Sequence, residues 1–467
     1  MAEVARNHVT DACTYLDSWL AFRCRMERVP GVQAAVLHDD EVVLSIAHGV
    51  SNTATGAPLT EGHLFRIASH SKTFTATAIM QLVEQGMVRL DDTVGRWIPE
   101  LGESSIAATT VRELLSHAGG VVRDGWDGDF WQLWRSFPDR SELLRVANDD
   151  AAVLPRNERF KYSNVGYSLL GLVIEAATGE SYGAYVTEQI VDRLGLLDTG
   201  PEFDPDRAGD YAGGHSALSY SDERIPIDHI DTGAMAAATG FYSTASELVR
   251  YMSAHFEHDE RLLSDDAKRQ MQRSEWEVDG TDGAYGLGFG IATIGGRRVL
   301  GHGGGYPGHI TRTFFDSVDR IAVSVFTNAI DGPALAWATA AIRLVNLASS
   351  DAGGERRSSG ELAAYCGRFA SLWGVYDIVD LGGRLYQLDP SLADPLASPT
   401  RLEVIDDQTL RIASTPGYGS RGQRLVYEFA SGGSTVSVRG TGTAYPIAVF
   451  SEAMRGRRQI SIGGARP

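Results

Sequence analysis

The order of strand-like and helix-like segments constrains the fold of this chain more than any other feature. Two strand-like runs near the beginning, 32–37 and 42–47, have the pattern of a hairpin. Four more such runs come late in the chain, at 289–293, 298–301, 311–315 and 321–327. The long stretch between the two groups, from 95 to 230, is rich in helices and loops. This order predicts an α+β fold, in which helices cover an antiparallel sheet and a helical subdomain is inserted.

Apolar spacing and helix-ending residues predict the helices that cover this sheet. An amphipathic helix is expected over 10–28, where Pro30 and Gly31 stop it. A second helix over 69–85 carries apolar side chains on more than one side, so we expect most of its circumference to be buried, with Gly86 as its C-terminal cap. Further helices are expected at 111–116, 143–147, 167–178, 184–194, 243–254 and 333–347.

Residues 351–360 have the composition of a linker, and the pattern changes beyond them. Short strand candidates then alternate with turn signals such as Gly382-Gly383 and Gly432-Gly433. These candidates lie at 375–379, 384–388, 402–405, 410–413, 425–429 and 436–438. Evenly spaced short strands predict a small antiparallel β-barrel. We therefore expect a first domain over 1–350 and a barrel domain over 361–467, joined by this linker.

Charge and cysteine content exclude several classes of protein. The 467 residues include 42 Lys and Arg against 60 Asp and Glu, and the net charge of −18 argues against a nucleic-acid partner. Cys13, Cys24 and Cys366 give neither a disulfide framework nor a paired-cysteine metal site. The first residues do not read as a secretory signal, and no apolar run has transmembrane length. We expect a soluble cytoplasmic protein without a membrane partner, although a chain with its leader removed would look the same. The oligomeric state cannot be read from the sequence.

The segment Ser69-His70-Ser71-Lys72 is the first that points to chemistry. Serine and lysine at this spacing face the same side of a helix, and a helix beginning at Ser69 would place its N–H at the positive end of the dipole. A partly desolvated lysine beside the hydroxyl loses its proton more readily and can act as a base. An N-cap serine and a surface lysine would give the same pattern. However, the apolar helix that follows would bury Lys72, and a buried lysine needs a reason.

Tyr162-Ser163-Asn164 is the second such segment. A tyrosine near a lysine ammonium can have a lowered pKa and act as a general base. Asn164 could hold the lysine or a substrate amide. The alternative is that Ser163 or Asn164 only caps the helix expected over 167–178.

The third segment, Gly301 to Gly308, lies between two strand-like runs. Glycines at a strand edge let a substrate approach the backbone and expose N–H donors. This segment also contains the dinucleotide-binding pattern G-x-G-x-x-G, but Pro307 interrupts it and a strand follows instead of a helix. His302 and His309 lack a third ligand at a recognisable spacing, so we expect no metal site. A tight hairpin is the alternative interpretation.

A fourth pattern, Gly179-Glu180-Ser181-Tyr182-Gly183, matches the G-x-S-x-G of a nucleophile elbow. That elbow requires a strand before the serine, whereas a helix is expected here. Gly179 is then expected to end one helix and Ser181 to cap the next.

In this order the motifs resemble the penicillin-recognising serine hydrolases, in particular the group of class C β-lactamases, DD-peptidases, D-aminopeptidases and esterases. The resemblance covers 10–348 and implies a β-lactamase/transpeptidase-like fold, and the region beyond resembles the lipocalin-like barrel of some members. The segments that carry it are Phe65–Lys72, Thr73–Ala76, Leu90–Asp92, Leu114–His117, Tyr242–Ala245, Tyr285–Gly288 and Val323–Asn328. It implies that Ser69 is the acylated nucleophile, that Lys72 and Tyr162 share the base and acid roles, and that Asn164 contacts Lys72 or the substrate amide.

The resemblance also implies a substrate-binding edge. The backbone N–H groups of Ser69 and Gly305 would form the oxyanion hole, with Gly303 and Gly304 beside the substrate. His302 falls where β-lactamases of this group carry the lysine of a Lys-Thr-Gly triad, which helps bind the carboxylate of penicillins and of C-terminal D-alanine. Histidine is largely neutral at pH 7, which disfavours those substrates. Esterase-like and D-aminopeptidase-like members carry His-Gly-Gly.

We therefore expect a serine hydrolase that forms an acyl-enzyme and cleaves small esters, amides or D-amino-acid peptides without a cofactor or metal. A β-lactamase or DD-carboxypeptidase is one alternative. A non-catalytic ligand-binding scaffold is another, against which the intact Ser69, Lys72 and Tyr162 argue. Tryptophans in the 121–134 loop could line an apolar pocket or pack in the core; they are Trp126, Trp131 and Trp134.

Overall fold

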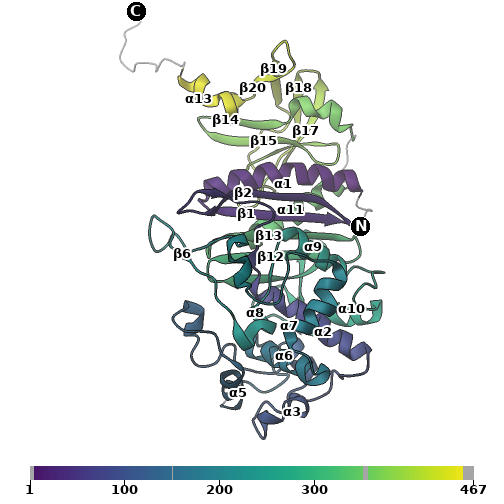
Figure 1. Cartoon of the computed structure of the whole chain (residues 1–467). Helices are drawn as coiled ribbons and strands as arrows, with labels where there is room; N and C mark the ends of the chain where they lie inside the picture. The colour runs from purple at the N-terminus through teal and green to yellow at the C-terminus, as the bar shows by residue number, and fades with distance from the viewer. Residues whose placement is uncertain (1–4, 150, 351–355, 456–467) are drawn as a thin grey trace, which may run out of the picture. The chain divides into compact units, whose positions relative to one another are not determined.

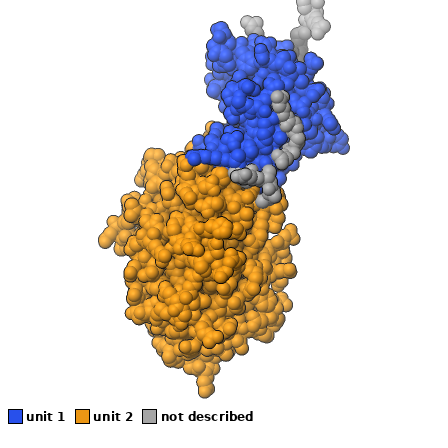
Figure 2. Space-filling model, turned by 90° about the vertical axis from the view of Figure 1, so that its right-hand side faces the viewer, with its two compact units in different colours: residues 1–23, 343–467 blue, residues 24–342 orange. Residues whose placement is uncertain are grey.

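The structure is a computed structural model that describes residues 5–149, 151–350 and 356–455. The chain forms two compact units, coloured separately in Figure 2. The larger unit comprises residues 24–342, and the barrel unit comprises residues 1–23 together with 343–467. The expected linker at 351–360 lies partly outside the described residues.

The larger unit is built on an antiparallel sheet that has nine strands among the described residues. The spatial order is β3-β2-β1-β13-β12-β11-β10-β9-β8, so the two groups of strands expected from the sequence meet where β1 pairs with β13. All eight residues of β1 are buried, including the polar Gln33 and His38. The bounds are β1 Gly31–His38, β2 Glu41–Asn52, β3 Ala57–Pro58, β8 Trp276–Glu277, β9 Ala284–Tyr285, β10 Gly290–Ile294, β11 Arg297–Tyr306, β12 His309–Asp316 and β13 Ile321–Thr327.

Helices of the larger unit gather on one side of this sheet, below β1 and β2 in Figure 1. α9 (Ala245–Ser253) lies against β1 and β13, and α2 (Ser71–Glu84) contacts α6 (Asn164–Thr178) and α8 (Ala236–Thr239). Every residue of α2 from Ser71 to Leu82 is buried, so the expectation of an almost fully buried helix is confirmed. The remaining α-helices are α1 Arg6–Met26, α3 Val94–Trp97, α4 Val111–Leu115, α5 Arg140–Asn148, α7 Tyr182–Val186, α10 Asp265–Gln272, α11 Ala334–Ser349, α12 Ser359–Leu362 and α13 Ile447–Arg455.

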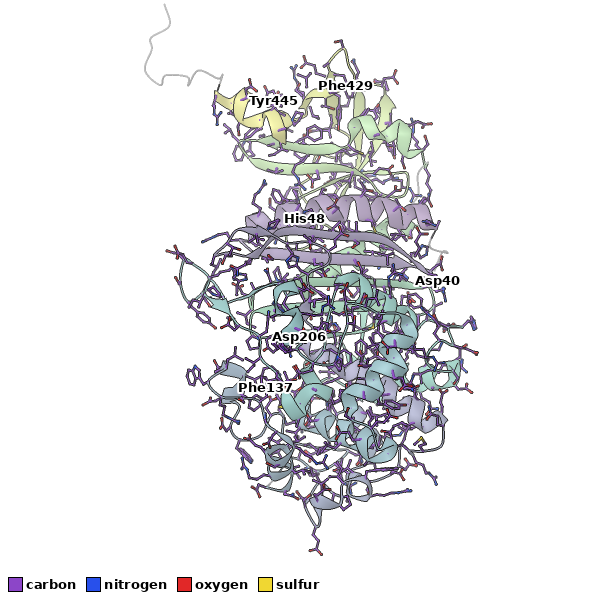
Figure 3. All side chains as sticks on the ribbon, viewed as in Figure 1. Asp40, His48, Phe137, Asp206, Phe429 and Tyr445 are labelled. Carbon is purple, nitrogen blue, oxygen red and sulfur yellow. The ribbon has the colours of Figure 1, made fainter. Side chains whose placement is uncertain are left out.

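Two expected helices differ from the structure. The helix expected over 184–194 is a short α7 followed by a π-helical turn over Thr187–Asp192. The helix expected to start at Ser69 starts at Ser71 instead, for a reason that concerns the site. Around the insertion, Phe137 packs with Phe130 and Met235 in a small separate cluster of its own (Figure 3).

The barrel unit contains a closed antiparallel barrel of eight strands, within the part of the chain that the structure describes. The six expected strands correspond to β15–β20, but the first and last were missed. β14 and β21 close the barrel by pairing Phe369 with Pro446 and Ala370 with Tyr445, which Figure 3 labels. Their sequences, GRFAS and TAYP, contain Gly and Pro and lack a strand signal. The bounds are β14 Gly367–Ser371, β15 Gly374–Asp380, β16 Leu385–Leu388, β17 Thr400–Asp406, β18 Thr409–Ser414, β19 Arg424–Phe429, β20 Thr435–Arg439 and β21 Thr443–Pro446.

Candidate active site

Ser69 lies in a 3-10 turn, Ala68–His70, directly before α2. The expectation that Ser69 opens the α-helix is therefore wrong. Ala68 has a φ of +44°, which a residue with a side chain rarely adopts and which prevents the helix from starting earlier. The Ser71 hydroxyl fixes this turn, because it donates to the Ala68 carbonyl at 2.6 Å and accepts from the Phe241 N–H at 3.0 Å. Strained backbone of this kind concentrates at functional sites.

Ser69 is also the one residue between Leu64 and Leu82 that is not buried. The residues on either side of it, Ala68 and His70, are both 0 % exposed. The serine hydroxyl is thus open to a substrate while the groups that surround it are withdrawn from water. In this setting each electrostatic contact to the hydroxyl is stronger than it would be in water.

Lys72 lies one helical turn beyond Ser69 and is fully buried. Its Nζ is 3.2 Å from Ser69 Oγ, 2.6 Å from Asn164 Oδ1 and 2.8 Å from the Ala238 carbonyl oxygen. Burial lowers the pKa of Lys72 well below its ordinary value. The amide and carbonyl oxygens can only accept, so an uncharged amine donates its two hydrogens to them and turns its lone pair toward the Ser69 hydroxyl.

Tyr162 approaches the same hydroxyl from the other side. Its O–H donates to Ser69 Oγ at 2.8 Å, and its ring centre is 4.8 Å from Lys72 Nζ. Burial raises the pKa of Tyr162, so the phenol keeps its proton. The expected lowering of the tyrosine pKa by a lysine ammonium is therefore wrong, because Lys72 is itself shifted toward the neutral form. The His117 ring, 4.4 Å away, packs against Tyr162 and accepts from the Ser163 N–H at 3.1 Å.

Asn164 opens α6, and both interpretations of its segment hold at once. Ser163 caps the helix by accepting from the Gly166 N–H at 2.8 Å, while the Asn164 side chain faces Lys72. Asn164 Nδ2 donates to Asp124 Oδ1 at 2.6 Å. Because a carboxylate only accepts, Asp124 orients the amide so that its oxygen points at Lys72.

Asp124 is a site residue that the sequence analysis missed. It lies in the 121–134 loop, where no periodic pattern marks any position. Asp124 Oδ1 also accepts from Trp131 Nε1 at 3.0 Å. Trp126 and Trp134 of the same loop are exposed by 73 % and 79 %, so they do not belong to the core.

His302 lies close to the site, but both of its ring nitrogens are hydrogen-bonded to other groups. Its Nδ1 is 2.7 Å from the Gly303 carbonyl oxygen, and its Nε2 is 3.1 Å from the hydroxyl of Tyr285, a residue that the sequence analysis quoted only as framework. A carbonyl only accepts, so Nδ1 carries the hydrogen and Nε2 accepts from Tyr285. Burial lowers the pKa of His302 well below its ordinary value, so the ring is uncharged at neutral pH. His302 itself therefore supplies no cation, and the charged side chain beside this part of the strand is Arg312 of β12, which pairs opposite Gly303.

The glycines of β11 allow it to pass close to the turn that carries Ser69. A Cβ on Gly304 would be 2.1 Å from the Ile67 carbonyl oxygen. β10 pairs with β11 only as far as Gly301, so the segment Gly303–Gly305 is paired by β12 on one side. Gly305 is exposed. The alternative interpretation of this segment, a tight hairpin, is confirmed, since β12 follows directly after Pro307 and Gly308.

The remaining patterns have structural roles. Gly179, with a φ of +76°, ends α6, and exposed Ser181 caps α7 by accepting from the Ala184 N–H at 3.3 Å, as expected for that pattern. Among the described residues no group of three or more His, Cys, Asp or Glu side chains is placed to hold a metal ion. No helix in the described ranges is both long and apolar enough to cross a membrane.

Comparison with known proteins shows the family in which this arrangement of residues occurs. The family model described as Beta-lactamase matches residues 20–346, more than half of the chain. Esterase EstB of Burkholderia gladioli is 31 % identical over 199 residues, which are 40 % of this chain and 50 % of EstB. Penicillin-binding protein 4 of Amycolatopsis lactamdurans is 31 % identical over 172 residues, which are 36 % of this chain and 44 % of that protein. The chain spans about half the length of the curated relatives it matches.

Solved structures extend the likeness. SurE has a TM-score of 0.62 at 25 % identity and covers 94 % of this chain and 99 % of its own. The octameric penicillin-binding protein homologue from Pyrococcus abyssi has a TM-score of 0.64 at 25 % identity and covers 92 % of this chain and 99 % of its own. The D-amino acid amidase from Ochrobactrum anthropi SV3, at 23 % identity, shares the fold with a TM-score of 0.62, over 73 % of this chain and 100 % of its own. Since the matched residues 20–346 contain the whole constellation around Ser69, the chain belongs to the Beta-lactamase family.

Proposed function

We propose that this chain is a serine hydrolase that cleaves small esters, amides or D-amino-acid-containing peptides through an acyl-enzyme. One observation carries the proposal: a single accessible hydroxyl, that of Ser69, is held 3.2 Å from the Lys72 amine and 2.8 Å from the Tyr162 phenol. Opposite shifts of the two pKa values support a neutral base and a protonated acid at neutral pH.

In the first step, Ser69 Oγ attacks the substrate carbonyl carbon while its proton passes to the lone pair of Lys72 Nζ. The carbonyl oxygen becomes an oxyanion, for which the N–H groups of Ser69 and Gly305 are the proposed donors. The bond to the leaving group then breaks, and the leaving oxygen or nitrogen takes a proton from Tyr162. Lys72 passes the proton that it accepted from Ser69 on to Tyr162. Water releases the acyl group by the same steps in reverse.

The names of two similar proteins favour the ester and amide branch of the proposal. EstB is named an esterase, and one structural neighbour is named a D-amino acid amidase. The uncharged His302 removes the cation that a β-lactam or D-alanine carboxylate would need at that position. We therefore propose ester or D-amide hydrolysis as the activity, in preference to β-lactamase or DD-carboxypeptidase activity. A non-catalytic scaffold would have no need of a desolvated Lys72.

Hydrolysis of three chromogenic probes by the wild type and by Ser69→Ala tests the proposal. The probes are a short-chain 4-nitrophenyl ester, D-alanine 4-nitroanilide and nitrocefin. We expect turnover of the ester or the amide that Ser69→Ala abolishes. Efficient nitrocefin turnover would move the protein to the β-lactamase branch, and equal rates for mutant and wild type would remove Ser69 as nucleophile.

A further inference from the structure

A cation lies beside the proposed acid, Tyr162. The Arg123 guanidinium carbon is 5.2 Å from the centre of the Tyr162 ring, whose hydroxyl donates to Ser69. The Arg123 side chain is 64 % exposed, so a molecule bound at Ser69 can reach it from the solvent side. The Tyr162 ring thus lies in contact with both the Arg123 guanidinium and, through its hydroxyl, Ser69.

The backbone holds this arginine rigidly. The Arg123 carbonyl oxygen accepts from the N–H groups of Asn164 at 2.8 Å and Val165 at 3.1 Å, at the start of α6. Arg123 Nε lies 3.2 Å from Asp124 Oδ2. Neither Nη group donates a hydrogen bond to a residue that the structure describes, and the ion pair with Asp124 has its contact at Nε. The Asp124 contact therefore fixes the guanidinium through one edge and leaves the forked end free.

The charged groups next to the proposed acid are Arg123, Lys161 and the Asp124 carboxylate, which together leave one positive charge in excess. Burial lowers the pKa of both Lys72 and His302, while Lys161, next to Tyr162 in sequence, has an ammonium without an ionic partner among the described residues. Burial, followed by the charge of Arg123, lowers the pKa of Lys161, which places the two cations near one another. In a chain of net charge −18, two cations beside the proposed acid run against the average composition.

We propose that Arg123, with Lys161 as a weaker second cation, forms a subsite that selects substrates carrying a carboxylate on the part that lies beside Tyr162. The free Nη1 and Nη2 groups match the two oxygens of a carboxylate, a geometry that only a guanidinium supplies. This inference rests on the proposed serine hydrolase and adds its substrate class. The carboxylate belongs either to the acyl part or to the leaving group, and the two sources can be separated experimentally.

Two matched pairs of esters test the subsite. Mono-4-nitrophenyl glutarate against 4-nitrophenyl valerate places the charge on the acyl part, and 3-acetoxybenzoate against its methyl ester places it on the leaving group. We expect the wild type to prefer the charged member of one pair. Arg123→Gln should lower kcat/KM for that member by about tenfold or more, the effect of one charge-assisted hydrogen-bonded pair, and change the neutral member less than about twofold. Lys161→Gln should have a smaller effect of the same sign.

Arg159→Gln is the matched control, because Arg159 is also exposed, by 56 %, but already pairs with Glu158 and Asp279. It should change neither member of either pair. An Arg123→Gln variant that slows charged and neutral esters equally, or slows neither, would overturn the subsite and leave the hydrolase proposal intact. If the wild type cleaves none of these esters, protection of Ser69 from phenylmethylsulfonyl fluoride by benzoate replaces the assay. If benzoate protects the wild type but not Arg123→Gln, the subsite is supported. If benzoate protects both proteins equally, or protects neither, the subsite is overturned. If the reagent does not label Ser69 at all, the proposed function is contradicted instead.

Discussion

The larger unit buries two lysines in different surroundings. Lys72 on α2 and Lys268 on α10 are 0 % and 2 % exposed. Lys268 Nζ lies 2.7 Å from Asp265 Oδ1 and also donates to two carbonyl oxygens, those of Phe256 at 2.6 Å and Asp259 at 2.5 Å. The hydrogen-bond partners of Lys72 are all neutral, and the nearest carboxylate of the site, Asp124, stands behind Asn164.

This difference separates a structural lysine from one arranged for chemistry. A buried ammonium is tolerated where a carboxylate pairs with it, as around Lys268. Where the partners are neutral oxygens, burial favours the free amine, as around Lys72. Burial alone therefore does not identify a catalytic lysine, and the partners of the nitrogen do.

The largest expected difference is in activity. Lys72→Met should lower kcat/KM for the preferred ester by about a thousandfold or more, because the proposed base is lost. The thermal unfolding midpoint should change little by comparison. A Lys72→Met enzyme with a tenth or more of wild-type kcat/KM would show that another group accepts the Ser69 proton.

Lys268→Met should have the opposite effect. Removing the cation leaves Asp265 and two buried carbonyl oxygens without their partner, which should lower the free energy of unfolding by roughly 2–3 kcal/mol. Activity per folded molecule should be unchanged. Urea unfolding followed by circular dichroism, together with the ester assay, measures both quantities. Loss of activity without loss of stability would contradict the structural role.

Asp124→Asn should reduce kcat by about tenfold, since an amide can present either its oxygen or its NH2 to Asn164 and no longer fixes the orientation of the Asn164 side chain. The charge of Asp124 raises the pKa of Lys72 against the dominant effect of burial, so without it the pKa should fall further. The acid limb of the kcat/KM profile should then move to lower pH. Asp127→Asn is the control, because Asp127 lies in the same loop, is 63 % exposed and pairs with Arg135. A merely structural role for Asp124 would change the melting temperature and leave the acid limb in place.

The smallest expected effect concerns Asp265, the carboxylate that pairs with Lys268. The hydrogen bond from Lys268 is the main reason that the pKa of Asp265 falls to about 2. The pKa of Asp265 is lower in the folded than in the unfolded protein, so its ionised form stabilises the fold at any pH above about 4. This stabilisation is lost as the pH falls from about 4 toward the folded-state pKa of about 2. Asp265→Asn should therefore destabilise the protein at pH 7 and match the wild type at low pH. An equal difference at pH 7 and pH 3 would mean that the ion pair is not its source.

Much of the site could be predicted from sequence because its parts are local. Ser69 and Lys72 are one helical turn apart, so their proximity follows from helix geometry once a helix is expected. Six of the nine sheet strands among the described residues, and six of the eight barrel strands, were likewise visible as short apolar runs, whereas the two-residue strands β3, β8 and β9 were not. The barrel-closing strands β14 and β21 were not, because their pairing, rather than their composition, makes them strands.

Other features depend on residues that are far apart in sequence. The Ala68 turn exists because Phe241, 170 positions after Ser71, hydrogen-bonds to the Ser71 hydroxyl. The role of Asp124 depends on α6 carrying Asn164 to it. Neither leaves a periodic or compositional trace, and the pKa of Tyr162 was expected in the wrong direction because the sequence does not reveal how completely its surroundings exclude water.

By itself the sequence determined the fold class and most of the order of the elements, and it predicted Ser69, Lys72, Tyr162 and Asn164 as site residues, because these follow from local spacing and from motifs that resemble a known family. Only the tertiary structure decided the charge state and orientation of those groups. Proton affinity depends on burial and on partners brought from distant segments, and a hydrogen bond depends on distances that no linear pattern contains.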